Sequence, residues 1–237
     1  MSRWLLPLVA AIGALVGAAA IWSWDRLAAP GGVEQARIER VVRDYVLTHP
    51  EIIPEAMQRL QDRESGKAVA QNAGAITTPF AGAWAGNPKG DITLVEYFDY
   101  NCGYCRASVP LIERLIANDP NLRVVYRDLP VLAPSSRAAA RVSLAAAAQG
   151  RFRAFHDALY AAGPVSDATI RAAATRAGVD PAGADAKAIE AEIGRNLDTA
   201  GKLGVTGTPS WVIGDRVLSG MLPIDQLEAA IAAARRR

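Results

Sequence analysis

The 237-residue sequence predicts an α/β fold. Between residues 92 and 126, a strand pattern, a helix pattern and a second strand pattern follow one another. Two short strand patterns joined by a two-residue turn occur at 210–219, and helical patterns fill the interval at about 133–203. This order predicts a parallel strand–helix–strand unit, a helical insertion, and a hairpin that extends the same sheet with antiparallel strands.

Composition excludes several classes of protein. The chain has 26 Lys and Arg against 24 Asp and Glu, and this balance does not provide the basic face of a nucleic-acid-binding protein. A hydrophobic content of 51% with 21% charged residues excludes wholesale disorder. Two cysteines are too few for a disulfide-dense scaffold or an all-cysteine zinc site.

Residues 1–30 are predicted to hold a membrane-directed segment and a short linker. Residues 4–24 carry no charge, and a helix of this length spans about 31 Å at roughly 1.5 Å per residue, enough to cross a bilayer. Arg3 precedes the run, which favours an amino end that stays in the cytoplasm. Either way of using such a segment places the rest of the chain outside the cytoplasm, in a bacterium in the oxidising periplasm.

Two readings of this segment compete. Trp4, Trp22 and Trp24 flank the run as interfacial anchors do, which favours an uncleaved signal anchor. Ala18–Ala20 offers small residues for cleavage of a signal peptide instead. A buried soluble helix is a third reading, against which the uncharged length argues.

Residues 31–76 are predicted to form a helical arm. An apolar stripe at helical spacing is interrupted by His49–Pro50 and then resumes on a second helix, against a background of mixed charge. Within residues 33–64 the stripe fits either two helices packed on the main domain or an arm that pairs with other copies of the chain. The stripe consists of Ile38, Val41, Val42 and Tyr45, then Ile53, Met57 and Leu60.

Residues 77–237 are predicted to form the main domain. Residues 72–90 are expected to be a connection with a short edge strand near 78–80. A helix is expected to begin at Cys102, and a last helix at Pro223. The other expected strands are Ile92–Phe98, Leu122–Tyr126, Ser210–Ile213 and Arg216–Ser219, with the helical insertion at about 133–203.

The candidate active site is the motif Cys102-Gly103-Tyr104-Cys105, directly after a predicted strand and at the start of a helix. A thiolate is the nucleophile of disulfide exchange, and a helix N-terminus is expected to lower the pKa of Cys102. Cys105 lies one turn further along the helix, near enough to close a disulfide with Cys102 and expected to be more buried. We therefore expect Cys102 to attack and Cys105 to resolve the mixed disulfide.

Two other readings of the cysteines are weaker. A structural disulfide across two intervening residues would close a tiny loop and add little stability. A metal site needs about four ligands, and the two histidines, His49 and His156, lie within helical patterns. The sequence therefore predicts a redox-active pair with no metal and no cofactor.

A second motif precedes the predicted hairpin. The blocks FDYNCGYC, residues 98–105, and GVTGTPSWVIG, residues 204–214, resemble the DsbA-like branch of thioredoxin-fold thiol–disulfide oxidoreductases. The resemblance covers about residues 80–237 and implies a thioredoxin fold with a helical insertion. In that family the proline matching Pro209 is cis and lies against the catalytic disulfide. The residue matching Thr208 offers its backbone to the substrate as an added strand.

The resemblance also assigns a role to Glu96, six residues before Cys102. In the family this position carries a buried acid that assists proton transfer to the second cysteine. Burial would raise the pKa of Glu96. Strand alternation alone leaves open whether this side chain is buried or exposed.

The arm, notably the stretch IERVVRDYVLTHPEIIPEAMQRL within residues 33–64, is similar to the N-terminal segment of ScsC-type (suppressor of copper sensitivity) members, some of which are oligomeric. Gly103–Tyr104 replaces the Pro-His of strongly oxidising members. A threonine directly before the proline, here Thr208, is similar to the pattern of DsbC-type isomerases. The motifs therefore imply oxidation, isomerisation or both.

The leading hypothesis is an exported thiol–disulfide oxidoreductase that acts on cysteine-containing proteins. Such an enzyme needs a membrane redox partner that resets the cysteine pair. An alternative is a copper-binding or copper-tolerance protein, because thiolates are soft ligands that suit Cu(I). A third hypothesis is a non-catalytic chaperone or scaffold, for which both cysteines would be dispensable.

Overall fold

The computed structural model describes residues 5–28 and 33–236, with side chains for 13–24 and 34–236. The chain divides into two compact units, Met1–Gln58 and Arg59–Arg237. Each unit is described by itself.

The first unit contains α1 (Leu5–Ala28), α2 (Val33–Thr48) and the first turns of α3 (Ile52–Thr77). Helix α2 stops where the sequence predicts, because Pro50 has no N–H with which to continue the helix. The apolar stripe of α2 faces solvent, and Ile38, Val41, Val42 and Tyr45 are each more than half exposed. Within this unit the stripe is therefore uncovered.

Of the helices in the described residues, none is both long enough and apolar enough to cross a membrane. The predicted anchor begins at Trp4, which lies outside the described residues, as do Arg3 and residues 29–30 of the predicted linker.

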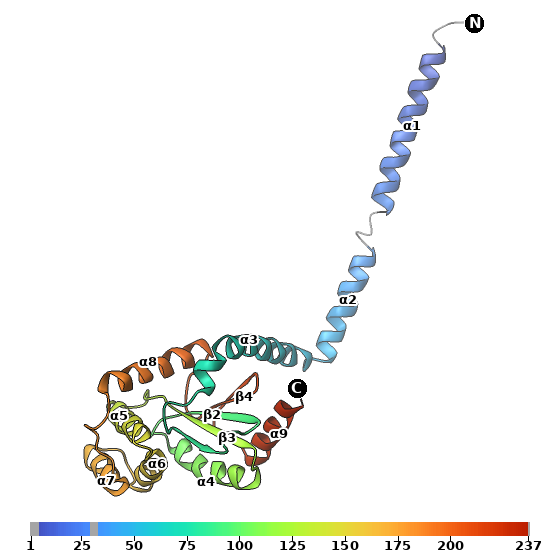
Figure 1. The fold of residues 1–237 in the computed structure, drawn as a ribbon. Coiled ribbons are helices and arrows are strands. Elements are labelled where there is room, and N and C mark those ends of the chain that lie inside the picture. Colours follow the sequence, from blue (N-terminus) through green and yellow to red (C-terminus); the bar gives the residue numbers. More distant parts are fainter. Residues whose placement is uncertain (1–4, 29–32, 237) are drawn as a thin grey trace. The chain divides into compact units, whose positions relative to one another are not determined.

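The second unit is built on a five-stranded sheet, shown in Figure 1. β2 runs parallel to β3, and the hairpin strands add antiparallel pairs, as the order of the sequence patterns predicts. β1 also pairs antiparallel with β3. The spatial order is β1-β3-β2-β4-β5, which places β2 at the centre. The strands are β1 (Trp84–Gly86), β2 (Ile92–Phe98), β3 (Leu122–Asp128), β4 (Ser210–Ile213) and β5 (Arg216–Ser219).

Helices cover both faces of this sheet, which is why β2 is apolar along most of its length. Leu94 and Phe98 pack into the cluster that contains residues of α4 (Gly103–Asn118) and α9 (Ile224–Arg235). Val95 and Tyr97 point the other way, into the cluster with α3 and α8 (Ala186–Lys202). The strand period therefore assigns residue 96 to the face that α4 covers.

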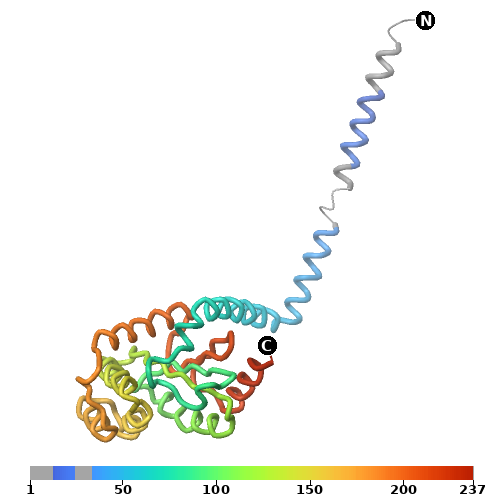
Figure 2. Tube along the Cα trace, viewed as in Figure 1, coloured from blue at the N-terminus to red at the C-terminus, as the bar shows by residue number. Residues whose placement is uncertain are grey.

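The helical insertion lies where the sequence predicts it, between β3 and β4. It consists of α5 (Pro134–Ala148), α6 (Phe152–Ala161), α7 (Asp167–Ala177) and α8. Figure 2 traces these segments around the sheet. Helix α7 has regular ends, with Ser166 as N-cap and Gly178 in the left-handed conformation as C-cap.

One prediction for the start of this domain is wrong. Residues 72–77 are not a connection but the last turns of α3, and the edge strand is β1 rather than residues 78–80. The alanine-rich stretch favours helix, and Val69 and Ile76 bury their side chains against the sheet. Tertiary packing thus extends the helix beyond the point at which its apolar stripe becomes irregular.

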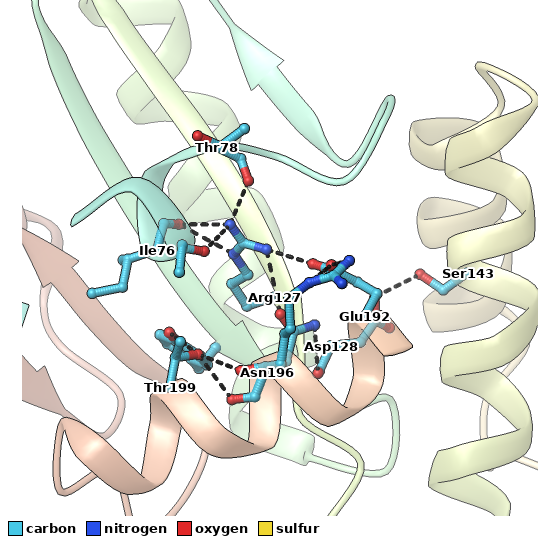
Figure 3. A network of polar contacts seen from close by, with 11 residues as sticks. Ile76, Thr78, Arg127, Asp128, Ser143, Glu192, Asn196 and Thr199 are labelled. Carbon is cyan, nitrogen blue, oxygen red and sulfur yellow. Dashed lines mark hydrogen bonds and ion pairs between the residues drawn. The ribbon is translucent and has the colours of Figure 1, made fainter. Parts of the chain in front are cut away.

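A buried cation explains where α3 ends. Arg127, in β3, donates hydrogen bonds to the carbonyl oxygens of Ala75, Ile76 and Thr78 at the end of this helix (Figure 3). Its guanidinium also pairs with Glu192 of α8, and both side chains are less than 5% exposed. Arg127 therefore satisfies carbonyl groups that a helix C-terminus leaves unpaired and joins α3 to α8.

We expect Arg127→Met to lower the free energy of unfolding by about 3–5 kcal/mol, because it leaves the buried Glu192 carboxylate without its buried partner. The matched control is Arg195→Met, since Arg195 pairs with the same carboxylate but is 57% exposed. Its loss should cost less than about 1 kcal/mol. Urea unfolding followed by circular dichroism measures both, and equal losses would contradict the role given to Arg127.

Candidate active site

Cys102 is the N-cap of α4, immediately beyond the loop that follows β2. Its Sγ accepts a hydrogen bond from the backbone N–H of Cys105 at 3.2 Å. On the other side its thiol donates to the carbonyl oxygen of Thr208, also at 3.2 Å. Both cysteines are free thiols in this structure. The sulfur thus lies between a helix N-terminus and a strand start more than 100 residues away.

Thr208 and Pro209 are held at this place by the sheet. The peptide bond between them is cis, as the family resemblance implies. Pro209 precedes β4, and its carbonyl accepts the N–H of Gly220 at 2.8 Å, so the hairpin fixes this segment. The pairing of β2 with β4 brings Tyr97 opposite Ser210 and so places Thr208 beside the CGYC motif.

The loop that carries Cys102 is organised by Asp99, which is 2% exposed and which the sequence analysis did not single out. Its carbonyl accepts the N–H of Cys102 at 3.0 Å and the hydroxyl of Tyr160 at 3.1 Å. Its carboxylate accepts three backbone N–H groups within 3.0 Å. The donors are Asn101, Val131 and Leu132.

Asp99 thereby holds an apolar rim at the site. After residue 76, the exposed large apolar side chains among the described residues are three: Tyr104, Val131 and Leu132, each at least half exposed. Tyr104 belongs to the CGYC motif, and the other two belong to the loop that Asp99 anchors. Exposed apolar surface that gathers at one place marks an interaction site.

Cys105 lies behind Cys102, with 1% of its surface exposed against 6% for Cys102. Burial raises the pKa of the Cys105 thiol strongly, and the nearby Glu96 raises it further. Both cysteines are buried, and Cys105 is the more buried of the two, as the sequence analysis expects; its raised pKa favours the protonated thiol.

Glu96 is buried in β2, with 1% of its surface exposed, so the structure selects the buried alternative. Burial raises its pKa to about 8, while a hydrogen bond from Ser108 acts in the opposite direction. The carboxyl is therefore poised to exchange a proton near neutral pH.

Ser108 was missed by the sequence analysis. It lies in α4, one turn beyond Cys105, and its hydroxyl is 2.8 Å from the Glu96 carboxyl. The available signal was a single polar residue within the buried stripe of that helix, which otherwise contains Cys105, Ile112 and Leu115.

Each of the two histidines packs against a tyrosine ring of its own unit. His49 is exposed at the end of α2, and its ring stacks on Tyr45. His156 is buried in α6, where burial lowers its pKa to about 3, so that the ring is neutral. Among the described residues, no three His, Cys, Asp or Glu side chains lie together in a group that could hold a metal ion.

These features define a class of protein. A CxxC motif at a strand-to-helix junction, opposite a cis-proline and above a buried acid, is the site of a thioredoxin-fold thiol–disulfide oxidoreductase. Residues 93–232, more than half of the chain, match the DSBA-like thioredoxin domain. The chain belongs to this family. Residues 34–65 match the copper resistance protein ScsC N-terminal domain, as the similarity of the arm implies.

Solved structures agree with this placement. A linker-deletion mutant of ScsC from Proteus mirabilis is 28% identical, with a TM-score of 0.69, over 85% of this chain and 95% of its own. A thioredoxin-like oxidoreductase from Silicibacter pomeroyi is 38% identical, with a TM-score of 0.64, over 69% of this chain and 98% of its own.

A longer curated relative also matches. The Na(+)/H(+) antiporter NhaA 1 of Salinispora arenicola is 32% identical over 157 residues, which is 63% of this chain and 24% of the relative. The chain thus spans about a quarter of the length of this relative.

Proposed function

We propose that the chain exchanges disulfides with cysteine-containing proteins through Cys102 and Cys105. The observation that carries the proposal is the position of the Cys102 sulfur, between the N-terminus of α4 and the carbonyl of Thr208, with Cys105 buried one turn behind. An incoming chain can reach the Cys102 sulfur at this place, whereas the Cys105 sulfur can be reached only by the sulfur of Cys102.

The reaction follows from this asymmetry. The Cys102 thiolate attacks one sulfur of a substrate disulfide, forms a mixed disulfide and releases the other substrate sulfur as a thiolate. The Cys105 thiol then gives its proton to the Glu96 carboxylate, and the resulting thiolate attacks the Cys102 sulfur. This displaces the substrate as a second thiolate and closes the Cys102–Cys105 disulfide. The reverse sequence of steps oxidises a substrate dithiol. When another thiolate of the substrate attacks the mixed disulfide instead, the disulfide of the substrate is isomerised.

Two features support a protein chain as the substrate. The backbone of Thr208, held by Pro209 at the start of β4, can pair with an extended segment as an added strand. The apolar rim formed by Tyr104, Val131 and Leu132 would contact apolar side chains that flank the substrate cysteine. Gly103, exposed within the motif, keeps the approach to Cys102 free of a side chain.

Reversible chemistry of this kind needs an oxidising compartment and a partner that resets the pair. The uncharged run at residues 4–24, part of which lies outside the described side chains, supports a signal anchor that holds the catalytic domain on the periplasmic face of the inner membrane. A cleaved signal peptide would give the same compartment. With this placement, we expect the partner to be a membrane protein that reoxidises or reduces Cys102 and Cys105.

We expect Cys102→Ser to abolish reactivation of a scrambled, disulfide-containing substrate, because it removes the nucleophile. Cys105→Ser should instead accumulate a mixed disulfide with the substrate, because the resolving thiol is missing. Intact-mass spectrometry and the regained activity of the substrate measure these outcomes, with the double serine variant as the control.

Wild-type reactivation no better than that of Cys102→Ser would contradict the catalytic role. So would an adduct that forms equally in both single variants.

When the full chain is fractionated from cells, the Cys105→Ser variant should be found with the membrane, and its recovery in the soluble fraction would exclude the anchor.

We further propose that residues 33–64 associate with other copies of the chain. The exposed stripe of α2 and the match to the ScsC N-terminal domain support this proposal. Several catalytic sites in one assembly would favour isomerisation, because two cysteines of one substrate could be engaged together. Val41→Glu should lower the mass of the full chain measured by sedimentation, and Ala36→Glu, on the opposite side of the helix, should not. A wild-type monomer would contradict the association.

A second candidate is Cu(I) binding by the two thiolates. The match of residues 34–65 to a copper resistance protein favours it, and thiolates are soft ligands. Burial, however, raises the pKa of the Cys105 thiol and so opposes the form with two thiolates. The geometry therefore supports exchange better, and a mixed disulfide trapped on Cys105→Ser separates the two, because copper binding predicts none.

A further inference from the structure

The hydroxyl of Ser108 lies between the buried acid and the resolving cysteine. Its Oγ is 2.8 Å from Oε1 of Glu96 and 2.8 Å from the carbonyl oxygen of Cys105. Ser108 has none of its surface exposed, so water does not compete for either contact. The hydroxyl thus connects β2 to the first turn of α4.

A serine hydroxyl has one hydrogen to donate. The carbonyl of Cys105 can only accept. Both contacts are full two-centre hydrogen bonds at the same time only when Glu96 is protonated and donates to the serine oxygen, while the serine donates to the carbonyl. When Glu96 is ionised, the hydrogen of Ser108 must turn toward the carboxylate, and the bond to the Cys105 carbonyl is lost.

We propose that Ser108 is a positioning residue that couples the proton of Glu96 to the turn of helix that carries Cys105. This inference rests on the proposed function. Before resolution the hydroxyl stabilises the Glu96 carboxylate that accepts the thiol proton. After the transfer it turns back to the Cys105 carbonyl and restores the first turn of α4.

Among the groups that surround Glu96, Ser108 has the main influence on the ionisation of its carboxyl. From the elements packed against it, the groups that face this carboxyl are Cys105 of α4, Tyr126 of β3 and Tyr160 of α6, with Trp211 of β4 opposite in the sheet. Burial keeps both tyrosines protonated by raising their pKa values. Among the described residues that shift the pKa of Glu96, Ser108 is the hydrogen-bond donor.

The test is an infrared titration of the Glu96 carboxyl in the reduced full chain, with the carbonyl band assigned by its loss in Glu96→Gln. In wild type the protonated band should disappear with a midpoint near pH 8. Ser108→Ala should raise this midpoint by about one to two pH units, because the donor that favours the carboxylate is gone. Ser108→Thr, which keeps a hydroxyl, should restore the wild-type midpoint.

Ser143→Ala is the matched control, since Ser143 is equally buried but its hydroxyl contacts Asp128 and Tyr100 instead. It should leave the Glu96 band unchanged. The wild-type band provides a check without any variant: it should have the frequency of a hydrogen-bonded carboxylic acid. A band of a free acid, or an unshifted midpoint in Ser108→Ala, would overturn the inference.

A kinetic readout separates this inference from the proposed function. Release of substrate from a preformed Cys102 mixed disulfide should shift to higher pH in Ser108→Ala by the same amount as the infrared midpoint. If wild type exchanged no disulfides, the proposed function would fail while the infrared coupling could still hold. If wild type were active but Ser108→Ala shifted neither readout, the inference alone would fail.

Discussion

The pairing of β2 with β4 places the two halves of the site together. Cys102 follows β2 and Thr208 precedes β4, and they meet only because the central strand hydrogen-bonds to a strand more than 100 residues later in the chain. The covered faces of the sheet fix this register, since a shift of one residue would exchange Leu94 and Phe98 with Val95 and Tyr97 between two different clusters. The same register turns Glu96 toward α4. Disturbance of this strand pair would therefore separate Cys102, the cis-proline segment and Glu96 at once.

Burial and hydrogen bonding then distinguish the two thiols. Cys102 caps a helix and contacts backbone groups on both sides, whereas Cys105 is enclosed together with a carboxyl that has no buried cation as a partner among the groups that shift its pKa. The charged forms of Cys105 and Glu96 are each disfavoured by the low polarity of their surroundings. One proton moving between them avoids two buried charges. In the proposed exchange, the resolving step is thus tied to the protonation of Glu96, and the Ser108 hydroxyl contacts both Glu96 and the carbonyl of Cys105.

Local patterns were sufficient for much of the fold. The strands β2 to β5, the helical insertion and the hairpin follow from periodicity and turn residues, whereas β1 was expected at the wrong place; the CGYC motif identified the helix start. The end of α3 could not be predicted in this way, because Arg127 stabilises it through carbonyls about 50 residues earlier in the sequence. Asp99 and Ser108 were missed for a similar reason: their roles consist of contacts with other elements. The position of Glu96 needed the family resemblance, because a strand covered on both faces carries no alternation to read.

The central claim is that Cys102 and Cys105 form a disulfide that is made and broken in use. Equilibration of the full chain in glutathione buffers of graded potential, with free thiols counted after alkylation, tests this claim most directly. The account predicts a reversible two-electron transition between the dithiol and the disulfide, which is lost when either cysteine is replaced by serine. A pair that remained reduced, or remained oxidised, across the whole series would contradict it.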